Sequence, residues 1–558
     1  MTRMDNFQIS MPIKKKQMII WGTGVVAAEL FGRIQNEIAF FVDNDERKWG
    51  KTFCGKEIRS PSSITEWKDC YLVIAVRNAE GIVEQITEYG MIHFVDYEMY
   101  FDSVPPDDFS NAEETIQLYL NKLDHTEEWI NSCICLGVDF GAVEGLADYF
   151  DHWNRYTDRI KFLHIEEAGK DLSKMTVMAL PYFLSDHICS YSHRASNVSD
   201  EIVTYIKNKE TLYLAAQIMR KKQEKAQPLH EYGCIYYYYI FITRLVRKIK
   251  PKCFMIWNAF QAYHAVAAYI GRLYGIPVIH GEFGVLPGTY TFDTMGEMGK
   301  SAVACYAKEF KRLPVSKEEY VRAGEIWAYI RESGMNRRHQ RNGYMDRVIQ
   351  KLDNGKATVF IAGQNDETSG MHPYTEDTKE YHSPVFSSSL LSVIEIGKIA
   401  EKNNWNVIYK PHPYATFSEK DRSLIPENVI LAEGIGINYL ISLSDIVVTI
   451  VSQTSYMALL HEKPVLMIGY IQLRDKGCTY QAFTKDAIEP ELKKAITYGF
   501  TDGQKKAFQM HIAQLVKYYL YDDGCERKMR YGRNYPADMA DFMSLERELK
   551  EMRGKIVS

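Results

Sequence analysis

The chain has 558 residues, of which 46% are hydrophobic and 25% charged, and its net charge is −5. This length exceeds one hydrophobic core and predicts two to four domains, while the composition excludes a disordered or fibrous protein. The balanced charge indicates no nucleic-acid partner. The ten cysteines include no CxxC pair, which argues against a zinc site or a disulfide framework and favours reduced thiols.

Two patterns bear on where the protein works. The N-terminal segment, MTRMDNFQISMPIKKKQ, lacks the apolar stretch of a signal peptide. No run approaches the roughly 20 apolar residues that are needed to span a bilayer. We therefore expect the protein in the cytoplasm, or lying against the inner face of the cytoplasmic membrane.

A small α/β domain is predicted first, over residues 1–105. Short apolar runs indicate its buried strands, and a charged, proline-containing stretch over 102–114 indicates a linker after it. The predicted elements are strands at 17–21, 38–42, 71–76 and around 93–95, with a helix over 25–34.

A glycine-rich turn follows the first of these strands. Gly22 and Gly24 precede the predicted helix, and Asp43 ends the next strand about twenty residues later, which matches the dinucleotide fingerprint. In that interpretation a phosphate lies on the turn and Asp43 holds a ribose. The domain is half the size of a full dinucleotide domain and resembles the small Rossmann-like modules of sugar-modifying enzymes such as sugar acetyltransferases. Nucleotide binding and a purely structural turn therefore both stay open.

The second predicted domain covers residues 115–330. Its expected elements are a strand near 132–138, helices over about 200–250, a strand at 253–257, a helix over 262–273 and a strand at 277–280. The aromatic stretch 232–250 ends in four cations and is predicted to be a core helix, with a helix facing anionic lipid as the alternative. Residues 316–350 are dense in charge and predict a helical bridge.

The third predicted domain, residues 345–558, shows the clearest alternation of strands and helices. This pattern predicts a parallel sheet with right-handed crossovers, so the chain belongs to the α/β class with two Rossmann-like halves after the first domain. The expected strands are 358–362, 405–409, 429–431, 446–451 and 464–468, and the expected helices are 387–403, 439–443 and 455–461.

Polar side chains follow three of these strands. Loops at the carboxyl ends of parallel strands converge at one edge of the sheet, where a helix start with small hydroxyls can bind phosphate. A lysine and a histidine on the neighbouring loop would add donors for the leaving phosphate. The donor-binding candidates are Gln364, Asp366, Lys410, Ser452, Gln453, Thr454 and Ser455, with His412 as a catalytic candidate.

Several motifs resemble one family. The segments KPHP (410–413), SDIVVTIVSQTSYMALLHEKPVLMIG (444–469) and KGCTY (476–480) look like the C-terminal half of capsule polysaccharide biosynthesis glycosyltransferases. The upstream segment 280–301 and the loop GQNDETSG (363–370) are similar to further parts of that family. The resemblance covers roughly residues 250–485, and it implies a GT-B fold of the kind found in bacterial transferases that use CMP-Kdo.

The resemblance also implies roles. The C-terminal half should bind the donor nucleotide, and Glu282 and Asp293 should face the reacting sugar, where a carboxylate can stabilise or attack an oxocarbenium-like centre. No Asp-x-Asp motif occurs in these two halves, so we expect no metal and no cofactor beyond the nucleotide-sugar substrate. The expected partners are a glycan or lipid-linked acceptor and peripheral membrane or capsule-assembly partners.

Two alternatives remain. A glycerophosphotransferase that uses CDP-glycerol would also need a His-Pro loop and a serine-rich phosphate site. A non-catalytic nucleotide-sugar-binding assembly subunit would use the first domain for its ligand and the rest for docking. The residues that separate catalysis from binding are Glu282 and Asp293.

Overall fold

The computed structural model divides into two compact units, residues 1–142 with 150–252 (unit 1) and residues 143–149 with 253–558 (unit 2). The structure describes residues 17–34, 38–76, 79–91, 97–99, 109, 112–121, 123, 129–137, 161–165, 178, 180–184, 198–222, 229–335, 348–413, 415, 418–534, 536 and 539–557.

Unit 1 begins with a six-stranded sheet in the order β3-β4-β2-β1-β5-β6. The central strands pair in parallel, whereas β3 and β4 form an antiparallel hairpin. The strands are β1 (Gln17–Trp21), β2 (Ile38–Val42), β3 (Thr52–Phe53), β4 (Lys56–Arg59), β5 (Cys70–Ile74) and β6 (Tyr97–Met99).

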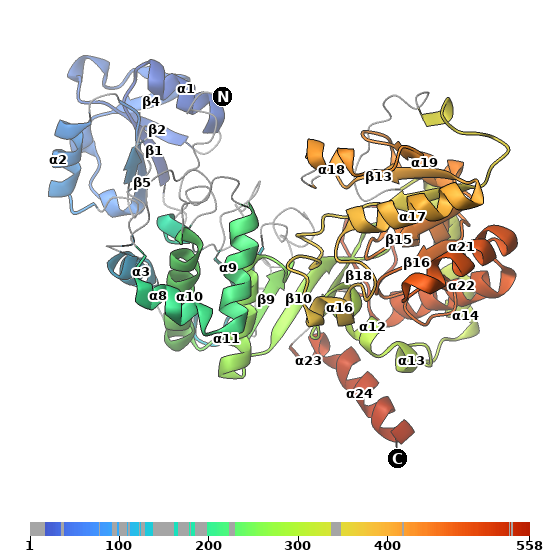
Figure 1. Cartoon of the computed structure of the whole chain (residues 1–558). Helices are drawn as coiled ribbons and strands as arrows, with labels where there is room; N and C mark the ends of the chain where they lie inside the picture. Colours follow the sequence, from blue (N-terminus) through green and yellow to red (C-terminus); the bar gives the residue numbers. More distant parts are fainter. Residues whose placement is uncertain are drawn as a thin grey trace. The chain divides into compact units, whose positions relative to one another are not determined.

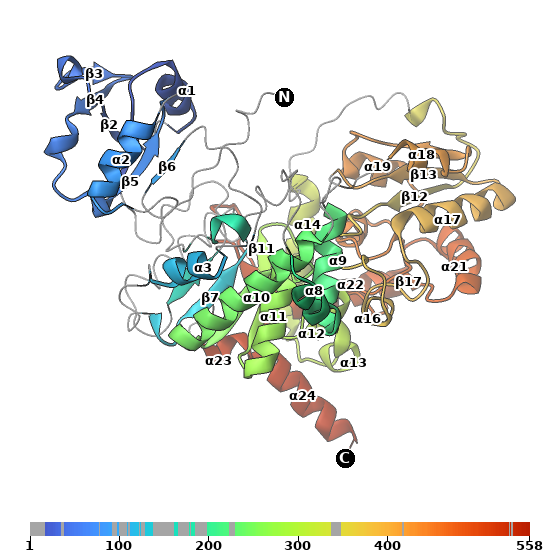
Figure 2. The same ribbon diagram turned by 60° about the vertical axis from the view of Figure 1, so that its left-hand side comes forward.

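Helices α1 (Val25–Ile34) and α2 (Glu80–Glu88) cover opposite faces of this sheet (Figures 1 and 2). Alternate residues of a strand point to opposite faces, so Ile20 packs in the cluster with Leu30 of α1, while Ile19 packs in the cluster with Ile86 of α2. The predicted separate N-terminal α/β domain is therefore confirmed.

The predicted strands and helix of this domain are confirmed at 17–21, 38–42 and 25–34, and β5 begins one residue before its prediction. The prediction of about four strands is wrong, since the sheet also contains β3, which has two residues, and β4, in which three of the four residues are charged. The strand expected around 93–95 lies outside the described residues, as does most of the expected linker.

The rest of unit 1 is built on a helical layer. Helix α10 packs against α3, α8 and α9. Tyr238 and most other residues of α10 are buried, so its aromatic stretch is core, as the leading interpretation predicts. Strands β7 and β8 pair in parallel. The elements are α3 (Ala112–Asn121), β7 (Cys133–Leu136), β8 (Phe162–His164), α8 (Asp200–Lys207), α9 (Glu210–Lys222) and α10 (His230–Ile249).

Unit 2 opens with strands that carry one half of the candidate site. β10 pairs in parallel with β9 and antiparallel with β11, and α11 packs on β9. The bounds are β9 (Cys253–Trp257), α11 (Ala262–Tyr274), β10 (Val278–Phe283), β11 (Thr289–Asp293), η6 (Met298–Lys300), α12 (Ala302–Cys305), α13 (Ala307–Phe310) and α14 (Lys317–Ser333).

A six-stranded parallel sheet follows, in the order β14-β13-β12-β15-β16-β17. Every residue of β12 is buried, as expected for a sheet covered on both faces. The elements are β12 (Thr358–Ala362), α16 (Glu376–Tyr381), α17 (Ser389–Asn403), β13 (Asn406–Lys410), α18 (Glu419–Ser423), β14 (Val429–Leu431), α19 (Ile437–Leu443), β15 (Ile446–Thr449), α20 (Thr454–Leu460), β16 (Val465–Met467), β17 (Tyr480–Gln481) and α21 (Lys485–Tyr498).

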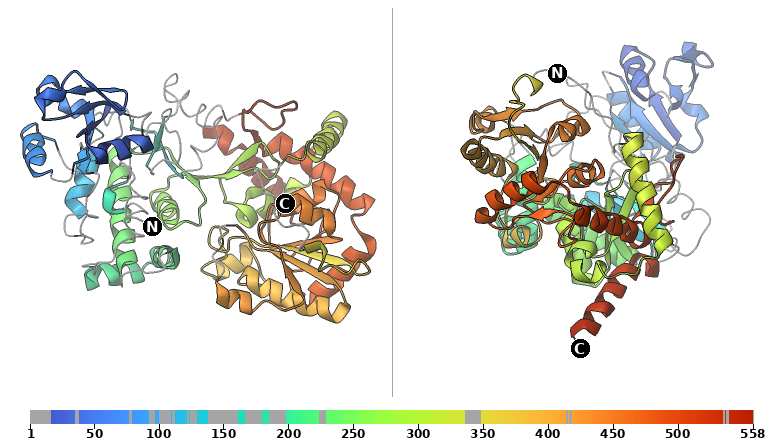
Figure 3. Two further views of the ribbon diagram at one scale, coloured as in Figure 1. Left: turned by 90° about the horizontal axis from the view of Figure 1, so that it is seen from above. Right: turned by 90° about the vertical axis from the view of Figure 1, so that its right-hand side faces the viewer.

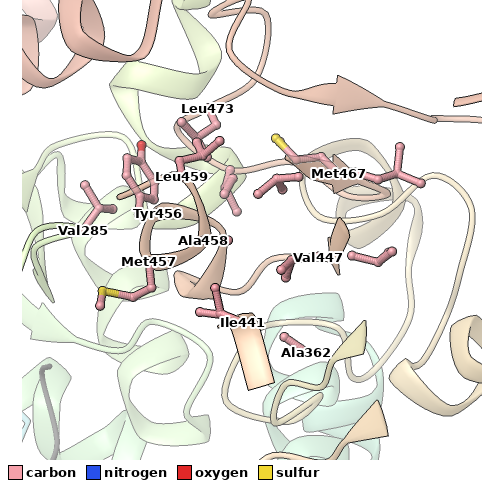
Figure 4. Close-up of a cluster of buried hydrophobic side chains, with 14 of the residues drawn as sticks. Val285, Ala362, Ile441, Val447, Tyr456, Met457, Ala458, Leu459, Met467 and Leu473 are labelled. Carbon is pink, nitrogen blue, oxygen red and sulfur yellow. The ribbon is translucent and has the colours of Figure 1, made fainter. Parts of the chain in front are cut away.

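One continuous hydrophobic core joins this sheet to the segment after β10. Val285 belongs to the same cluster as Val447 of β15 and Tyr456 of α20, and Figure 4 draws these side chains together. The loop that follows β10 and the helix that follows β15 are thus fixed on one core.

The C-terminal segment returns to the strands that open unit 2. After α22 (Asp502–Tyr518), β18 (Tyr521–Asp522) pairs antiparallel with β11. Arg527 donates from Nη2 to the carbonyl of Gly288 at 2.9 Å, in the loop after β10. Helices α23 (Met539–Phe542) and α24 (Ser544–Val557) end the chain (Figure 3). The predicted α/β class, with three mostly parallel sheets, is confirmed.

Among the described residues, no helix is both long enough and apolar enough to cross a bilayer. The domain boundaries predicted at 105, 115, 330 and 345 stay predictions.

Candidate functional site

The loop after β12 is tied to the loop after β15. Gln364 is buried, and its Oε1 accepts a hydrogen bond from the N–H of Val451 at 2.9 Å. Asp366 accepts from the N–H and the hydroxyl of Ser389 at 2.9 and 2.6 Å, which fixes the start of α17. Both candidates therefore hold the site together by contacts within the protein.

The loop after β13 lies against the same edge. The N–H of Gly363 donates to the carbonyl of Lys410 at 2.9 Å, and a Cβ on Gly363 would lie 2.8 Å from that oxygen. Only glycine fits this close approach. The Lys410 ammonium donates to the carbonyl of Ile435 at 2.6 Å, and burial lowers its pKa. His412 follows the buried Pro411 and is partly exposed.

The loop after β15 holds the four remaining donor-binding candidates. Ser452 accepts from the N–H of Thr454 at 3.2 Å and donates to its hydroxyl at 3.0 Å, while the Ser455 hydroxyl donates to the carbonyl of Ser452 at 2.8 Å. These hydroxyls shape the turn into α20. The side-chain amide of Gln453 instead donates to the carbonyl of Phe283 at 3.1 Å, at the end of β10. The structure thus brings all three loops to one edge of the sheet, beside β10.

Acidic side chains gather on one face of β10 and β11. The register pairs His280 with Asp293 and Glu282 with Thr291, so all four side chains lie on the same face. Glu282, predicted to face the reacting sugar, is half-buried one residue before the carbonyl that Gln453 contacts. The hydrogen bond from Gln453 therefore places the loop 452–455, which is the predicted phosphate site, close to the catalytic candidate Glu282.

Asp293 has a different setting. It is 3% exposed, and its carboxylate accepts from the N–H groups of Met295, Gly296 and Ala302 at 2.8, 3.2 and 2.8 Å. Burial raises the pKa of Asp293 to about 6, against the lowering effect of those hydrogen bonds. This geometry fits a residue that fixes the turn 293–302, and contact with a sugar stays a prediction.

That turn carries Glu297, which the sequence reasoning did not single out. Glu297 is 3% exposed, its Oε1 accepts from the N–H of Ala259 at 2.8 Å, and its carboxyl lies within hydrogen-bonding reach of Glu282. Burial raises the pKa of Glu297 well above its usual range, and the charge on Glu282 raises it further. In the sequence, Glu297 could have been noticed as an acidic residue between Gly296 and Gly299 in the segment 280–301.

His280 was also missed as part of this cluster. Its Nδ1 lies 4.0 Å from Oε1 of Glu297. Burial lowers the pKa of His280 to about 3, so the ring is neutral at physiological pH and does not offset the nearby carboxyl charge.

The two glycines of the N-terminal turn in unit 1 differ in the space around them. Gly22 has φ +120°, and a Cβ there would lie 2.7 Å from Val76, so the position requires glycine. Nothing lies within 4 Å of a Cβ on Gly24. Asp43 accepts from Lys48 at 2.8 Å and from the Thr23 hydroxyl, and these bonds lower its pKa although burial opposes them. Nucleotide binding at this turn stays a prediction.

Among the residues with described positions, no group of three or more His, Cys, Asp or Glu is placed to hold a metal ion.

Comparisons with known proteins find a family that is similar to part of this chain. Residues 374–502 match the model described as capsule polysaccharide biosynthesis protein. This part of the chain is similar to that family. The match includes the KPHP loop, the loop 452–455 and the KGCTY segment, so the resemblance predicted from those motifs is confirmed. Residues 14–93 match the model described as C2185-like, N-terminal.

Similar solved structures include the KpsC beta Kdo 2,7 transferase of Thermosulfurimonas dismutans, with 14% identity, a TM-score of 0.35, and coverage of 56% of this chain and 89% of that one. The beta Kdo 2,4 transferase of the same KpsC has 15% identity, a TM-score of 0.33 and coverage of 47% and 79%. UDP-GlcNAc 2-epimerase from Neisseria meningitidis has 12% identity, a TM-score of 0.30 and coverage of 76% and 99%. No curated protein matches the sequence.

Proposed function

We propose that the protein is a GT-B glycosyltransferase of capsule or surface polysaccharide biosynthesis, which transfers a sugar from a nucleotide donor to a glycan or lipid-linked acceptor. The observation that carries the proposal is the hydrogen bond from Gln453 to the carbonyl of Phe283. It sets the loop before α20 beside the strand that bears Glu282. The family match of residues 374–502 supports the same activity.

In this proposal the three loops of the parallel sheet bind the nucleotide. Lys410 and His412 supply positive charge and donors for the departing phosphate, and the loop 452–455 supplies the hydroxyl of Thr454, since the Ser452 and Ser455 hydroxyls donate within the turn. Gln364 and Asp366 act by holding the loops, as their internal hydrogen bonds indicate. We expect turnover to continue in the presence of a metal chelator.

Glu282 would act on the sugar. When the nucleotide departs, the anomeric carbon becomes positively charged, and a carboxylate nearby stabilises it, attacks it, or removes the proton from the acceptor hydroxyl. We propose a Kdo-like acidic sugar on CMP as the donor. The resemblance of the motifs to transferases that use CMP-Kdo favours this choice.

The experiment is a panel of activated donors with the full chain. The protein is incubated with CMP-Kdo, CDP-glycerol and common UDP-sugars, and released CMP, CDP or UDP is measured. CMP release from CMP-Kdo supports the proposal, whereas glycerophosphate transfer from CDP-glycerol supports the phosphotransferase alternative. Binding without turnover of any donor supports an assembly subunit and contradicts the proposal.

A matched pair of variants tests the role of Glu282. We expect Glu282→Gln to lower kcat by about a hundredfold or more, since a transition-state charge loses its partner. Glu325→Gln, an exposed position on α14, should leave kcat unchanged. Equal activity in both variants would remove Glu282 from the mechanism.

A further inference from the structure

The carboxyl groups of Glu297 and Glu282 lie close enough to repel each other if both are ionised. Glu297 is buried, and its Oε1 already accepts a hydrogen bond from Ala259. Its Oε2 is buried and receives no hydrogen bond from a protein donor among the described residues, and the Glu297 carboxyl lies within hydrogen-bonding reach of the Glu282 carboxyl. Two ionised carboxylates in such contact, one of them out of water, repel strongly.

The groups around Glu297 do not remove that repulsion. No lysine or arginine within the described ranges forms an ion pair with it, and His280 on β10 is neutral. Asp293 on β11 adds negative charge from the same face, and its own carboxylate is bonded to main-chain N–H groups and to Tyr519. Lys300, on the same turn, pairs with Asp377 of α16.

We propose that Glu297 stays protonated at neutral pH and donates its proton in a hydrogen bond to Glu282, so that the two carboxyl groups together carry one negative charge. The main chain supports this arrangement, because the Ala259 N–H occupies Oε1 and leaves Oε2 to bear the proton. Glu297 is then a positioning residue that orients the Glu282 carboxylate.

This inference rests on the proposed function in one respect, which is the reaction that Glu282 serves. A nucleotide donor is anionic, so a second full negative charge beside Glu282 would weaken its binding. A neutral Glu297 avoids that charge and still holds Glu282 in one rotamer. The positive charge that develops on the sugar then meets a single, oriented carboxylate.

The protonation itself is tested without turnover. Infrared spectra of the full chain in D₂O at pH about 8 should show a protonated carboxyl band in the wild type that is lost in Glu297→Gln. Glu309→Gln removes another buried carboxyl, one that Arg553 pairs with and whose pKa that hydrogen bond lowers. This control should keep the band. A band that survives in Glu297→Gln overturns the proposal.

A second variant keeps the test valid if Glu297→Gln does not fold. In Glu282→Gln the repelling charge is gone, so the band of Glu297 should disappear at a lower pH than in the wild type. The same titration midpoint in both proteins overturns the coupling between the two groups.

The catalytic consequence has its own readout. Once a donor is identified, Glu297→Gln should keep most of the kcat, since glutamine also donates a hydrogen bond, and should lose the fall in activity at alkaline pH that deprotonation of Glu297 causes. If the activity of Glu297→Gln falls at alkaline pH as it does in the wild type, Glu297 does not have the positioning role. If no donor is turned over, the proposed function fails, and the infrared result still decides the proton sharing.

Discussion

The side-chain amide of Gln453 donates a hydrogen bond to the main-chain carbonyl of Phe283, 3.1 Å away, and so joins the helix start after β15 to the end of β10. Glu282 is the next residue towards the N-terminus from that carbonyl. Any shift of the loop 452–455 is therefore passed to the strand that bears Glu282.

Removing this bond should affect activity more than stability. We expect Gln453→Ala to lower the free energy of unfolding by about 1 kcal/mol and kcat/KM by about tenfold to a hundredfold, because the two halves of the site lose their alignment. Gln509→Ala breaks the same kind of bond, to the carbonyl of Tyr320 at 2.8 Å, between α22 and α14. Gln509→Ala should lose about as much stability as Gln453→Ala and should keep normal turnover. Equal kinetics in the two variants would contradict the link.

The raised pKa of Asp293 predicts a pH-dependent stability. Its ordinary value is 3.8 and its folded value about 6, so the folded chain binds this proton more tightly than the unfolded chain. The contribution is fully present below pH about 4 and is lost as the pH rises through about 6, a change of about 3 kcal/mol. Asp293→Asn should lack this dependence. Denaturant unfolding from pH about 4 to about 7 measures it, and parallel curves for the two proteins would refute it.

Gly299 lies where two segments nearly touch. A Cβ there would be 1.6 Å from the carbonyl oxygen of Tyr381 at the end of α16, so Gly299→Ala must displace the turn that carries Glu297. We expect a loss of roughly 1–3 kcal/mol in stability, together with reduced activity. Gly503→Ala in α22 has its nearest neighbour at 3.9 Å and should be neutral or slightly stabilising. Thermal midpoints of both variants provide the comparison.

The N-terminal turn has two glycines, Gly22 and Gly24, for which we expect opposite effects of substitution. Gly22→Ala should destabilise unit 1 by about 1–3 kcal/mol, because of its positive φ and the contact with Val76. Gly24→Ala meets no neighbour and should fold normally. If a nucleotide phosphate lies on this turn, Gly24→Ala weakens nucleotide binding in calorimetry. Unchanged affinity would show that the turn serves only packing.

Long apolar runs made much of the fold predictable. Strands β9 and β12 match their predicted bounds because each is mainly a continuous apolar run, buried at every position. The hairpin of β3 and β4 was missed because β3 has two residues and three of the four residues of β4 are charged, and its turn depends on Cys54 and Gly55 at positive φ. Such a hairpin has no pattern of hydrophobic residues that predicts a strand.

The convergence of the three loops at one edge of the sheet was predictable in the same way. Parallel-sheet geometry brings residues 364, 410 and 453 to one edge, and hydrogen bonds join their loops. Glu297 could not be placed, because its position depends on the hydrogen bonds that Asp293 makes to the turn 293–302. The involvement of β18 was equally hidden, since a strand of two residues is defined only by its partner β11.

The pairing of β18 with β11 has a consequence for how the polypeptide matures. During synthesis on the ribosome, β11 emerges long before Tyr521 and Asp522, so its edge lacks the partner strand β18 until those two residues have been made. An unpaired edge invites association with other chains. Nascent chains that have not reached β18 would therefore expose this edge, and β18 covers it once residues 521 and 522 have been added.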